Sequence, residues 1–415
     1  MRALVIGAGL GGLTLAHGLL RAGVEVTVFE RSGSAGAQPA SYGLHLDANG
    51  LGAAHACLPA ENWAILDRVA APARDAVTFR DKDLHPLAVI DREKDAAVDP
   101  VTRRRGIKRD ALRDALLHGL DDVILWDKKF VGYEKPPTGG VRVRFADGSS
   151  VEGDLLVAAD GSNSAVRAQY LPDLKRVDLG IVNIAGTIRL TPGLRDRLPA
   201  SLVDGSVNNV LPSGPGWVFT ANWLAPGGNS AQDSLVWAWA GARDSYPKGV
   251  EDMDGEALRR IVLDRLHGWS PALRQVVVDT DSSTIVPITL RSMPQLPSWT
   301  PSQVTLIGDA IHNMTPMGGV GANTALRDAD ALRVALLGHV NGTRDLVTAV
   351  GDYETTMREY ANEALAVSTR NARNATSPAR LPRTAFRTML RVAEALPPVK
   401  KAMFSPAAKA HSAKA

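Results

Sequence analysis

Ala3-Leu4-Val5-Ile6-Gly7-Ala8-Gly9-Leu10-Gly11-Gly12 contains the strongest structural signal in the chain. An apolar run leads into three spaced glycines, and Glu30 follows eighteen residues after the last of them. In such a pattern the first glycine makes a tight strand-to-helix turn, the second lets the backbone approach a pyrophosphate, and the third allows close helix packing. An acidic residue at the position of Glu30 accepts hydrogen bonds from ribose hydroxyls. The spacing predicts a dinucleotide-binding unit and leaves NAD and FAD open.

The residues after the glycines complete this unit. We expect a helix over residues 10–22, whose first amides and positive dipole end would hold the pyrophosphate, and a second strand over residues 24–29. Arg31, next to Glu30, is a further candidate nucleotide contact. The nucleotide contacts predicted from this unit are Gly7, Gly9, Leu10, Gly11, Gly12, Glu30 and Arg31.

Length and composition limit the possible classes of protein. A chain of 415 residues is long enough for two or more domains. Hydrophobic residues make up 45% and charged residues 22%, and no apolar run approaches the ~20 residues of a membrane span. The first 23 residues fit the nucleotide unit better than a signal peptide, so we expect a retained N-terminus. Cys57 is the single cysteine, which excludes an intramolecular disulfide and favours a reducing, cytoplasmic setting.

The net charge of +3 is unevenly distributed. Residues 377–415 carry eight lysines and arginines against Glu394 alone, a local +7, so the other residues sum to −4. Such a segment could contact nucleic acid or anionic lipid, but it has few interleaved aromatic residues. We expect a solvated helix followed by a frayed end, with no nucleic-acid partner and no assigned function.

Hydrophobic periodicity organises the remainder of the chain. Helices are expected at residues 108–120, 254–268, 321–337 and 343–370. Strands are expected at 123–125, 128–133, 141–145, 154–159, 181–190, 207–211, 217–223, 235–240, 282–290 and 303–307. The strand before Asp160-Gly161 ends in a carboxylate and a glycine, like a second strand-to-helix junction. The strands from 177 to 287 alternate with turn residues and indicate an inserted antiparallel sheet.

Three motifs occur in a fixed order: the glycine pattern with Glu30, then Asp160-Gly161, then Gly308-Asp309-Ala310-Ile311-His312 with Pro316 and Gly318-Gly319-Val320-Gly321-Ala322-Asn323. With these motifs the chain resembles the class A flavin-dependent monooxygenases, the group typified by para-hydroxybenzoate hydroxylase. The resemblance covers about residues 1–370. Ile311 departs from the pattern, where alanine is usual, and raises a minor packing question. The resemblance implies that the dinucleotide is FAD.

The resemblance also implies a fold and a division into domains. The fold is an α/β protein in which a Rossmann-like FAD-binding domain carries an inserted, mostly antiparallel β-sheet domain and C-terminal helices. We assign residues 1–72, 101–176 and 286–374 to the FAD-binding domain. Residues 73–100 and 177–285 form the substrate domain, and residues 375–415 form a C-terminal helix and basic tail.

Further cofactor contacts follow from the resemblance. They are Arg109, Asp160, Gly161, Gly308, Asp309, Pro316, Gly318, Gly321, Ala322 and Asn323. Asp309 would accept from ribityl or ribose hydroxyls, and the helix after Gly321 would point its positive end at the flavin ring. His312 is expected to be structural, and no side-chain base and no metal site are predicted. Arg103-Arg104-Arg105 is interpreted as a solvated loop.

The resemblance implies a reaction in which NADPH or NADH reduces FAD, oxygen adds at C4a, and the flavin hydroperoxide transfers one oxygen atom to a small molecule. Backbone at Pro316 and Gly318 would contact the hydroperoxide. We expect hydroxylation of an aromatic or polycyclic compound, of the kind found in secondary metabolism. Candidate substrate contacts are His45, Arg189, Trp217, Phe219, Asn222 and Met293.

Alternatives with the same fold remain open. They are epoxidation, Baeyer–Villiger insertion, isoprenoid reduction or cyclisation, and a non-enzymatic flavin-binding partner. The intact motif from Gly308 to Asn323 argues against the last. A flavin-dependent halogenase is disfavoured because Trp237-Ala238-Trp239 lacks the Ile-Pro that completes the halogenase signature.

Overall fold

The computed structural model describes residues 1–34, 43–72, 76–91, 99, 101–137, 139–228, 232–377 and 379–404. Its contacts divide the chain into two compact units. Unit 1 comprises residues 1–72, 99–179 and 291–371, and unit 2 comprises residues 73–98, 180–290 and 372–415. In the described part of the chain, no helix has the length and apolarity needed to cross a bilayer.

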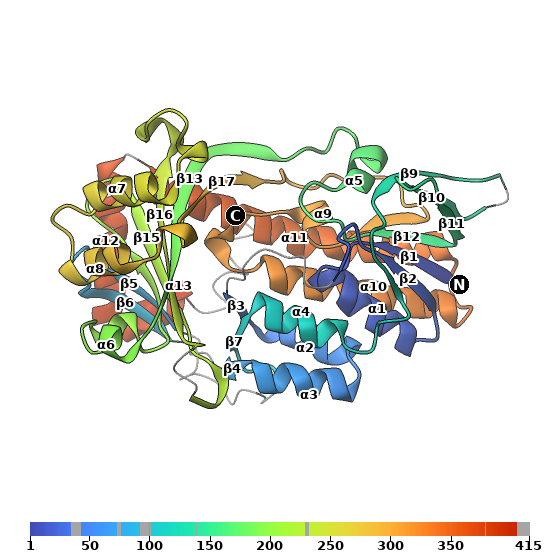
Figure 1. Ribbon diagram of the computed structural model, residues 1–415, viewed down its shortest axis with the longest axis horizontal. Coiled ribbons are helices and arrows are strands. Elements are labelled where there is room, and N and C mark those ends of the chain that lie inside the picture. The colour runs from blue at the N-terminus through green and yellow to red at the C-terminus, as the bar shows by residue number, and fades with distance from the viewer. Residues whose placement is uncertain are drawn as a thin grey trace. The chain divides into compact units, whose positions relative to one another are not determined.

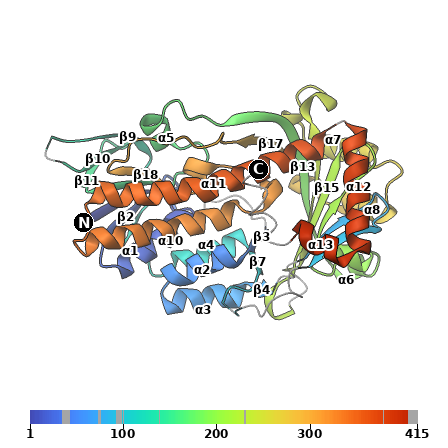
Figure 2. The same ribbon diagram turned by 180° about the vertical axis from the view of Figure 1, so that it is seen from behind.

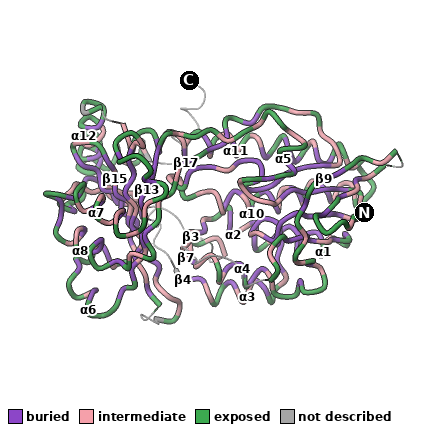
Figure 3. The backbone as a smooth tube through the Cα atoms, turned by 45° about the horizontal axis from the view of Figure 1, so that its top comes forward, coloured by how far each residue is buried: buried purple, intermediate pink, exposed green. Residues whose placement is uncertain are grey.

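Unit 1 is built on a five-stranded parallel sheet (Figure 1). In spatial order its strands are β18 (Val304–Leu306), β12 (Leu155–Ala158), β1 (Arg2–Ile6), β2 (Glu25–Phe29) and β8 (Ile124–Leu125). All four residues of β12 are buried, as expected for a central parallel strand with both faces covered. Figure 3 draws the buried residues of the described chain in purple. In this strand order β1, β12 and β18 are neighbours in space although they lie far apart in the sequence. The sequence motifs that follow these strands are thereby brought together.

The carboxyl ends of four strands lie in one row. Ile6 of β1 pairs with Phe29 on one side and with Ala158 on the other, and Ala158 pairs in turn with Leu306. The glycine loop, Glu30, Asp160-Gly161 and Gly308-Asp309 follow these ends within two residues. In open parallel sheets, ligands bind outside the carboxyl ends of the strands. The register thus gathers all three motifs at the binding edge.

Helices and two small sheets complete unit 1. The helices are α1 (Leu10–Arg21), α2 (Ala48–Cys57), α3 (Ala60–Val69), α4 (Arg109–Leu117), α5 (Ala165–Tyr170), α9 (Asp309–His312), α10 (Gly321–Val340) and α11 (Leu346–Thr376). The small sheets are β3 (Gly43–Leu46), β4 (Ala71–Pro72) with β7 (Arg105–Lys108), and β9 (Phe130–Glu134), β10 (Val141–Phe145) with β11 (Ser150–Gly153). Helix α10 packs on both α1 and α2.

Unit 2 contains a seven-stranded sheet. Its order is β17 (Val286–Ser292), β13 (Val177–Arg189), β16 (Ser234–Ala242), β15 (Trp217–Trp223), β14 (Val207–Val210), β5 (Ala76–Arg80) and β6 (Pro86–Asp91). In this sheet β14 pairs with β5 in parallel. The pairs β13–β16, β16–β15, β15–β14 and β5–β6 are antiparallel. The period of two places Trp237 and Trp239 on one face, where they pack in a core with α7 (Gly255–Arg265) and α8 (Pro271–Asp279). We call this the back face and the opposite one the front face.

The C-terminal helices α12 (Arg380–Ala395) and α13 (Pro397–Phe404) belong to unit 2 (Figure 2). The expectation of a solvated helix is wrong for one side of α12, because Leu390 is fully buried among Leu87, Ala88 and Leu211. Arg383 donates to the carbonyl of Gly216 at 2.7 Å. The charge count concealed this docking, because a buried guanidinium can be satisfied by backbone carbonyls.

Several element boundaries differ from the expectation. Residues 282–284 form a 3₁₀ turn begun by Asp281, whose side chain accepts from the N–H of Ser283, so the expected strand starts later, at Val286. The last long helix runs from Leu346 to Thr376 instead of 343–370. Such capping turns shift element ends without changing the order of elements.

Candidate functional site

In the glycine loop, Gly7 and Gly12 are closely packed against backbone atoms, whereas Gly9 faces open space. A Cβ on Gly7 would lie 2.3 Å from the carbonyl oxygen of Ala159, and one on Gly12 would lie 2.2 Å from that of Gly7. Gly7 also has a φ of 112°, a region that favours glycine. A Cβ on Gly9 would meet nothing closer than 3.9 Å. Gly7 and Gly12 are therefore required by the chain's own packing, whereas Gly9 keeps the outer side of the loop clear.

Helix α1 begins directly after this loop without a side-chain cap. Its first amides lack intrahelical partners by construction, and the positive end of the helix dipole adds to their attraction for an anion. The open side at Gly9 and these amides together form a cradle that fits a pyrophosphate.

Glu30 lies beside the same loop and is 7% exposed. Its Oε2 accepts the N–H of Ala8 at 2.9 Å, and its Oε1 accepts the N–H and the Oγ–H of Ser32 at 3.0 and 2.9 Å. An ionised carboxylate has about four acceptor sites, so capacity remains for a ribose hydroxyl. Arg31 is exposed. Its contact with a nucleotide remains a prediction.

Arg113 is a residue that sequence reasoning missed. It is 6% exposed, and its Nε donates to the carbonyl of Ala8 at 3.3 Å. Burial lowers the pKa of Arg113, and the charge of Glu30 opposes that shift. The guanidinium thus supports the loop from behind. On sequence alone it was one arginine of an amphipathic helix, with no local signal for burial.

Asp160 provides the clearest test of whether a cofactor fits. Its Oδ2 accepts the N–H of Ala165 at 2.8 Å, so this oxygen holds the start of α5. Its Oδ1 is buried and accepts no hydrogen bond from a described residue. Burial raises the pKa of the Asp160 carboxyl. Because an orphaned buried acceptor is costly, a ligand hydroxyl donating to Oδ1 fits this position.

Gly308 and His312 are connected through a buried carboxylate. Gly308 has a φ of 59°, and its N–H donates to Asp328 Oδ2 at 2.6 Å. The same oxygen lies 2.6 Å from His312 Nε2, and Tyr360 donates its hydroxyl to Asp328 Oδ1 at 2.6 Å. Burial opposes protonation of His312, but Asp328 more than offsets it and the pKa of His312 is raised. His312 is therefore a structural ion-pair partner, and Asp309 beside it remains exposed.

Arg167 joins the second and third motifs. It is 7% exposed and donates from Nη1 to the carbonyl of Ala310 at 2.6 Å and from Nη2 to that of Ser162 at 3.0 Å. One guanidinium thereby links the loop after Asp160 to helix α9. The charges of Asp160 and Asp309 also act on it, although burial has the larger effect and lowers the pKa of Arg167.

The glycine-rich turn before α10 is held from behind by α11. Residues Pro316–Gly318 form a 3₁₀ turn, and Gly319 follows with a φ of 64°. Thr315 and Ser368 hydroxyls lie 2.6 Å apart, and both side chains are buried. A Cβ on Gly319 would meet nothing within 4 Å. The inner side of the turn is thus fixed while its outer side is open, and α10 begins at Gly321 without a side-chain cap.

Asn323 is a predicted cofactor contact, and its side chain makes hydrogen bonds within unit 1. Its Nδ2 donates to the carbonyl of His45 at 2.9 Å, and its Oδ1 accepts the N–H of Asp47 at 2.9 Å. A Cβ on Gly50 would lie 2.2 Å from that oxygen. The amide therefore fastens β3 to the start of α10. The contact of Asn323 with the cofactor stays a prediction.

His45 and Arg109 lie on neighbouring elements of unit 1. His45 pairs with Gly106 in the β3–β7 ladder, and Arg109 is the half-buried first residue of α4, directly after β7. Burial, assisted by the charge of Arg104, lowers the pKa of His45 to about 3. Its imidazole is neutral near pH 7 and is a weak base there. The expectation that no side-chain base operates remains a prediction.

The sequence is similar to known families and proteins. Residues 134–375 match the family model described as FAD binding domain, and residues 5–63 match an NAD(P)-binding Rossmann-like domain. The aurachin C monooxygenase/isomerase of Stigmatella aurantiaca is 30% identical over 377 residues, covering 88% of each chain. The chain belongs to the FAD-dependent monooxygenases. FAD is the cofactor that this family binds, which confirms the resemblance to class A flavin monooxygenases.

Two further relatives of this FAD-dependent monooxygenase are informative. A dual O-methyltransferase/FAD-dependent monooxygenase, CTB3 of Cercospora beticola, is 30% identical over 396 residues, which are 86% of this chain but 44% of CTB3. The chain thus spans less than half the length of that relative. A crystal structure of a candidate FAD-containing monooxygenase from Photorhabdus luminescens has 42% identity and a TM-score of 0.84, covering 91% of this chain and 98% of the other.

The predicted substrate contacts of the monooxygenase do not all lie on one face of the unit 2 sheet. Trp217 and Phe219 lie half-buried on the front face of the unit 2 sheet, and Arg189 lies exposed on the same face of β13. Asn222 has the opposite parity in β15, is 4% exposed and donates to the carbonyl of Leu202 at 2.6 Å. Asn222 and Phe219 therefore lie on opposite faces of the sheet, because odd-numbered and even-numbered residues of a strand face opposite ways. The substrate role of Asn222 stays a prediction.

Met293 also departs from its predicted role. It is 3% exposed and belongs to the hydrophobic core of unit 1. Its backbone N–H donates to the carbonyl of Asn313 at 2.8 Å. We therefore treat Met293 as a core residue that secures the segment between α9 and the glycine-rich turn.

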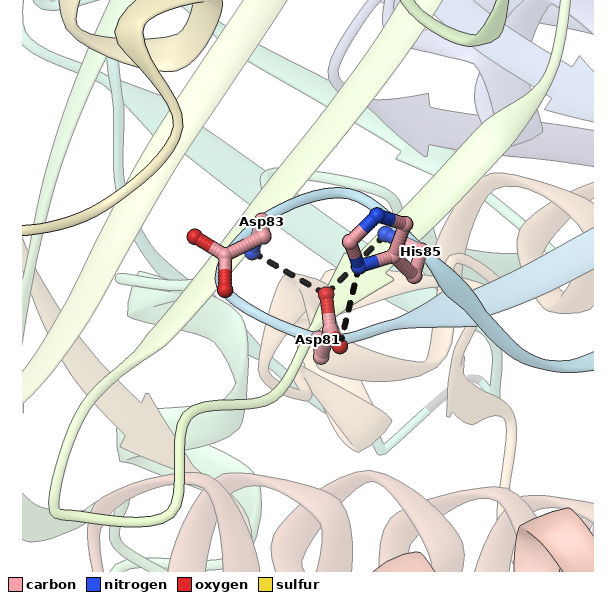
Figure 4. Close-up of side chains that lie close together, drawn as sticks. All are labelled: Asp81, Asp83 and His85. Atoms are coloured by element: carbon pink, nitrogen blue, oxygen red, sulfur yellow. Dashed lines mark hydrogen bonds and ion pairs between the residues drawn. The ribbon is translucent and has the colours of Figure 1, made fainter.

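One group of potential metal ligands occurs among the described residues of the monooxygenase. Asp81, Asp83 and His85 place their ligand atoms within 4.8 Å of one another at the turn between β5 and β6 (Figure 4). Asp81 Oδ1 accepts the N–H groups of Asp83 and His85, each at 3.0 Å. Lys82 Nζ already lies 3.1 Å from Asp83. These hydrogen bonds and this ion pair explain why the three side chains lie close together, because they close a tight turn. We therefore assign no metal ion to them.

Proposed function

We propose that this chain catalyses an NAD(P)H-dependent monooxygenation of an aromatic or polycyclic small molecule, with hydroxylation as the favoured reaction. One observation carries the proposal: the row formed by Ile6, Phe29, Ala158 and Leu306 places all three cofactor motifs at one sheet edge. The oxygenase names of the relatives support the reaction type.

The residues at this edge would hold FAD in an extended form. The amides of Leu10, Gly11 and Gly12 would bind the pyrophosphate, and Glu30 would accept from the ribose. Asp160 Oδ1, and the exposed carboxylate of Asp309, would accept from hydroxyls further along the cofactor. When bound, FAD supplies the redox chemistry that takes a hydride from NAD(P)H and transfers one atom of O₂ to the substrate.

The chain's own part in the reaction is electrostatic and positional. The uncapped amides at the start of α10 would stabilise negative charge on a group placed against them. Thr315 and Ser368 fix the backbone of the preceding turn, so Pro316 and Gly318 can present amide and carbonyl groups in a constant position. The ion pair between His312 and Asp328 keeps Gly308 in its left-handed conformation.

The front face of the unit 2 sheet would supply substrate contacts. Trp217, Phe219, Val236 and Ala238 give it half-buried aromatic and aliphatic surface. Planar apolar molecules bind well to such surfaces, because aromatic side chains offer large contact areas. Arg189 on the same face could orient an anionic or carbonyl oxygen.

The test uses the FAD-loaded chain with NADPH and NADH, a panel of aromatic and polycyclic compounds, and ¹⁸O₂. We expect O₂ uptake that a compound of the panel stimulates, and a product that carries one ¹⁸O atom. A product without ¹⁸O would indicate reduction or cyclisation instead. Absence of O₂ uptake with every compound, despite stoichiometric FAD, would overturn the proposal. The control for turnover without cofactor is the apoprotein of the unaltered chain, assayed with no added FAD.

A further inference from the structure

Helix α12 has an apolar face that the described chain leaves exposed. Three large apolar side chains of α12 and that of Leu396, which caps its C-terminal end, are 85, 39, 45 and 50% exposed, in the order Leu381, Met389, Val392 and Leu396. With the exposed Ala385 they follow the spacing i, i+4, i+8, i+11 and i+15, which is one side of a helix. We call Leu381, Ala385, Met389, Val392 and Leu396 the outer stripe.

The outer stripe is unusual within this chain. Fifteen large hydrophobic side chains are exposed among the described residues, and five of them fall between Leu381 and Val399. The opposite side of α12 already has partners, because Leu390 and Ala393 are fully buried and Arg383 and Arg387 donate to backbone carbonyls of unit 2. The stripe is therefore not the face that attaches the helix to its own unit.

Cationic residues accompany the stripe. Residues 379–404 contain six lysines and arginines against Glu394 alone, and Glu394 is paired with Lys400. Arg391 and Lys401 are exposed. The whole segment 377–415 carries +7, whereas the rest of the chain sums to −4. An anionic surface would therefore attract this end of unit 2 and repel the remainder of the protein.

We propose that the outer stripe docks on an anionic membrane surface, with α12 lying along the lipid headgroups. A helix with one apolar side and neighbouring cations has the features of interfacial helices, and acidic lipids supply the opposite charge. With 16 residues, α12 is shorter than the ~20 needed to span a bilayer. A second copy of this chain is a poorer occupant, because stripe-to-stripe pairing would bring two +7 segments together.

The experiment measures sedimentation of the full FAD-loaded chain with vesicles. The vesicles are phosphatidylcholine alone or phosphatidylcholine with about one-third phosphatidylglycerol. We expect binding to the anionic vesicles, little binding to the neutral ones, and release when salt is raised to about 0.5 M. Neutralising two surface cations, in the double variant R391Q/K401Q, should lower the partition coefficient about 30-fold, because each contributes roughly a fivefold effect.

Matched variants separate charge from the stripe. K248Q/R260Q removes two exposed cations elsewhere in unit 2 and should leave binding within about twofold of the original. M389S/V392S removes apolar surface from the stripe and should reduce binding at least tenfold, whereas T384S on the same helix should not. Unchanged FAD absorbance and unfolding temperature will establish that each variant is folded.

Four outcomes would overturn the proposal. The first is no sedimentation of the unaltered chain with anionic vesicles. The second is binding by M389S/V392S equal to that of the unaltered chain. The third is equal binding of the unaltered chain to neutral and anionic vesicles. The fourth is a dimer in solution that M389S/V392S converts to monomer without any vesicle binding, which would assign the stripe to a second copy.

Discussion

Asp328 Oδ2 accepts the backbone N–H of Gly308 across 2.6 Å, and this single contact connects α10 to the carboxyl end of β18. The oxygen is shared with His312, in an ion pair from which solvent is excluded. Removing one partner of a buried pair leaves the other charge unsatisfied and typically costs about 3–5 kcal/mol. The contact is thus both a determinant of stability and the support of a cofactor motif.

Asp328→Asn should therefore lower the free energy of unfolding by about 3–5 kcal/mol and leave the purified protein depleted in FAD. The control is Tyr360→Phe, which removes one hydrogen bond to the same carboxylate and should cost about 1 kcal/mol. Urea unfolding and the ratio of FAD to protein measure the two effects. Equal FAD content and stability in both variants would contradict this role of Asp328.

The glycine loop offers a pair of matched substitutions. Gly9→Ala places its Cβ in open space, so apoprotein stability should change by less than about 1 kcal/mol while FAD affinity falls at least tenfold. Gly12→Ala forces a contact of 2.2 Å with the Gly7 carbonyl and should destabilise the apoprotein by about 1–3 kcal/mol or more. Unfolding of the apoproteins and FAD titration separate the two. Normal FAD affinity of Gly9→Ala would contradict the assignment of Gly9 to cofactor binding.

Asp160→Asn tests the orphaned acceptor. The substitution keeps an oxygen to hold α5 but removes the charge that a ligand hydroxyl would meet, so the dissociation constant for FAD should rise about 10- to 100-fold. Asp154→Asn, which changes an exposed carboxylate just before the other end of β12, is the control and should leave it unchanged. Quenching of FAD fluorescence on binding to apoprotein provides the measurement. An unchanged dissociation constant for Asp160→Asn would exclude a direct contact.

Glu354 should make stability depend on pH. It is fully buried, accepts a hydrogen bond from Thr305 at 2.9 Å, and burial raises its pKa from 4.5 to about 7. The folded state then binds more protons than the unfolded state between these values, so stability is lost as pH rises through this window.

Glu354→Gln should remove that loss, which makes the variant more stable than the original by about 1–3 kcal/mol near pH 8 and about equal to it near pH 4.5. Glu359→Gln, at an exposed position of the same helix, should show no such difference. Urea midpoints measured across this pH range decide the matter. Parallel pH profiles for Glu354→Gln and the unaltered chain would show that the carboxyl does not titrate as inferred.

Phe219 and Asn222 should respond differently to truncation. Phe219→Ala on the front face should change the KM or kcat of the proposed reaction by about tenfold or more, with a smaller loss of stability. Asn222→Ala on the back face leaves the Leu202 carbonyl without its donor and should cost about 1–3 kcal/mol with KM unchanged. Steady-state kinetics and urea unfolding test both. An effect of Asn222→Ala on KM alone would contradict the face assignment.

The sequence predicted the parts of this site that depend on local patterns. Gly7, Gly9 and Gly12 sit in a turn whose geometry only a few sequences satisfy, and the apolar runs before Asp160 and Gly308 mark strands that end at those residues. Arg167, Asp328 and Ser368 were missed because each acts on a partner 16 to 143 residues away. Nothing in the neighbouring sequence distinguishes them from ordinary helical residues.

Burial of polar residues was similarly hidden. Asn222 was a candidate substrate contact, yet its side chain donates a hydrogen bond to the carbonyl of Leu202. The basic residues of α12 indicated a solvated helix, yet the guanidinium of Arg383 donates its hydrogen bonds to backbone carbonyls. Partners of this kind depend on tertiary placement, which a single sequence does not encode in any short window.

The row of strand ends in unit 1 also has a consequence for biosynthesis. Gly7 and the residues after it emerge from the ribosome about three hundred residues before β18 and Gly308 do. The parallel sheet completes its binding edge only when β18 has joined β12. Binding of FAD through all three motifs therefore requires β18 to have docked on β12, so we expect tight FAD retention to report that this strand is in place.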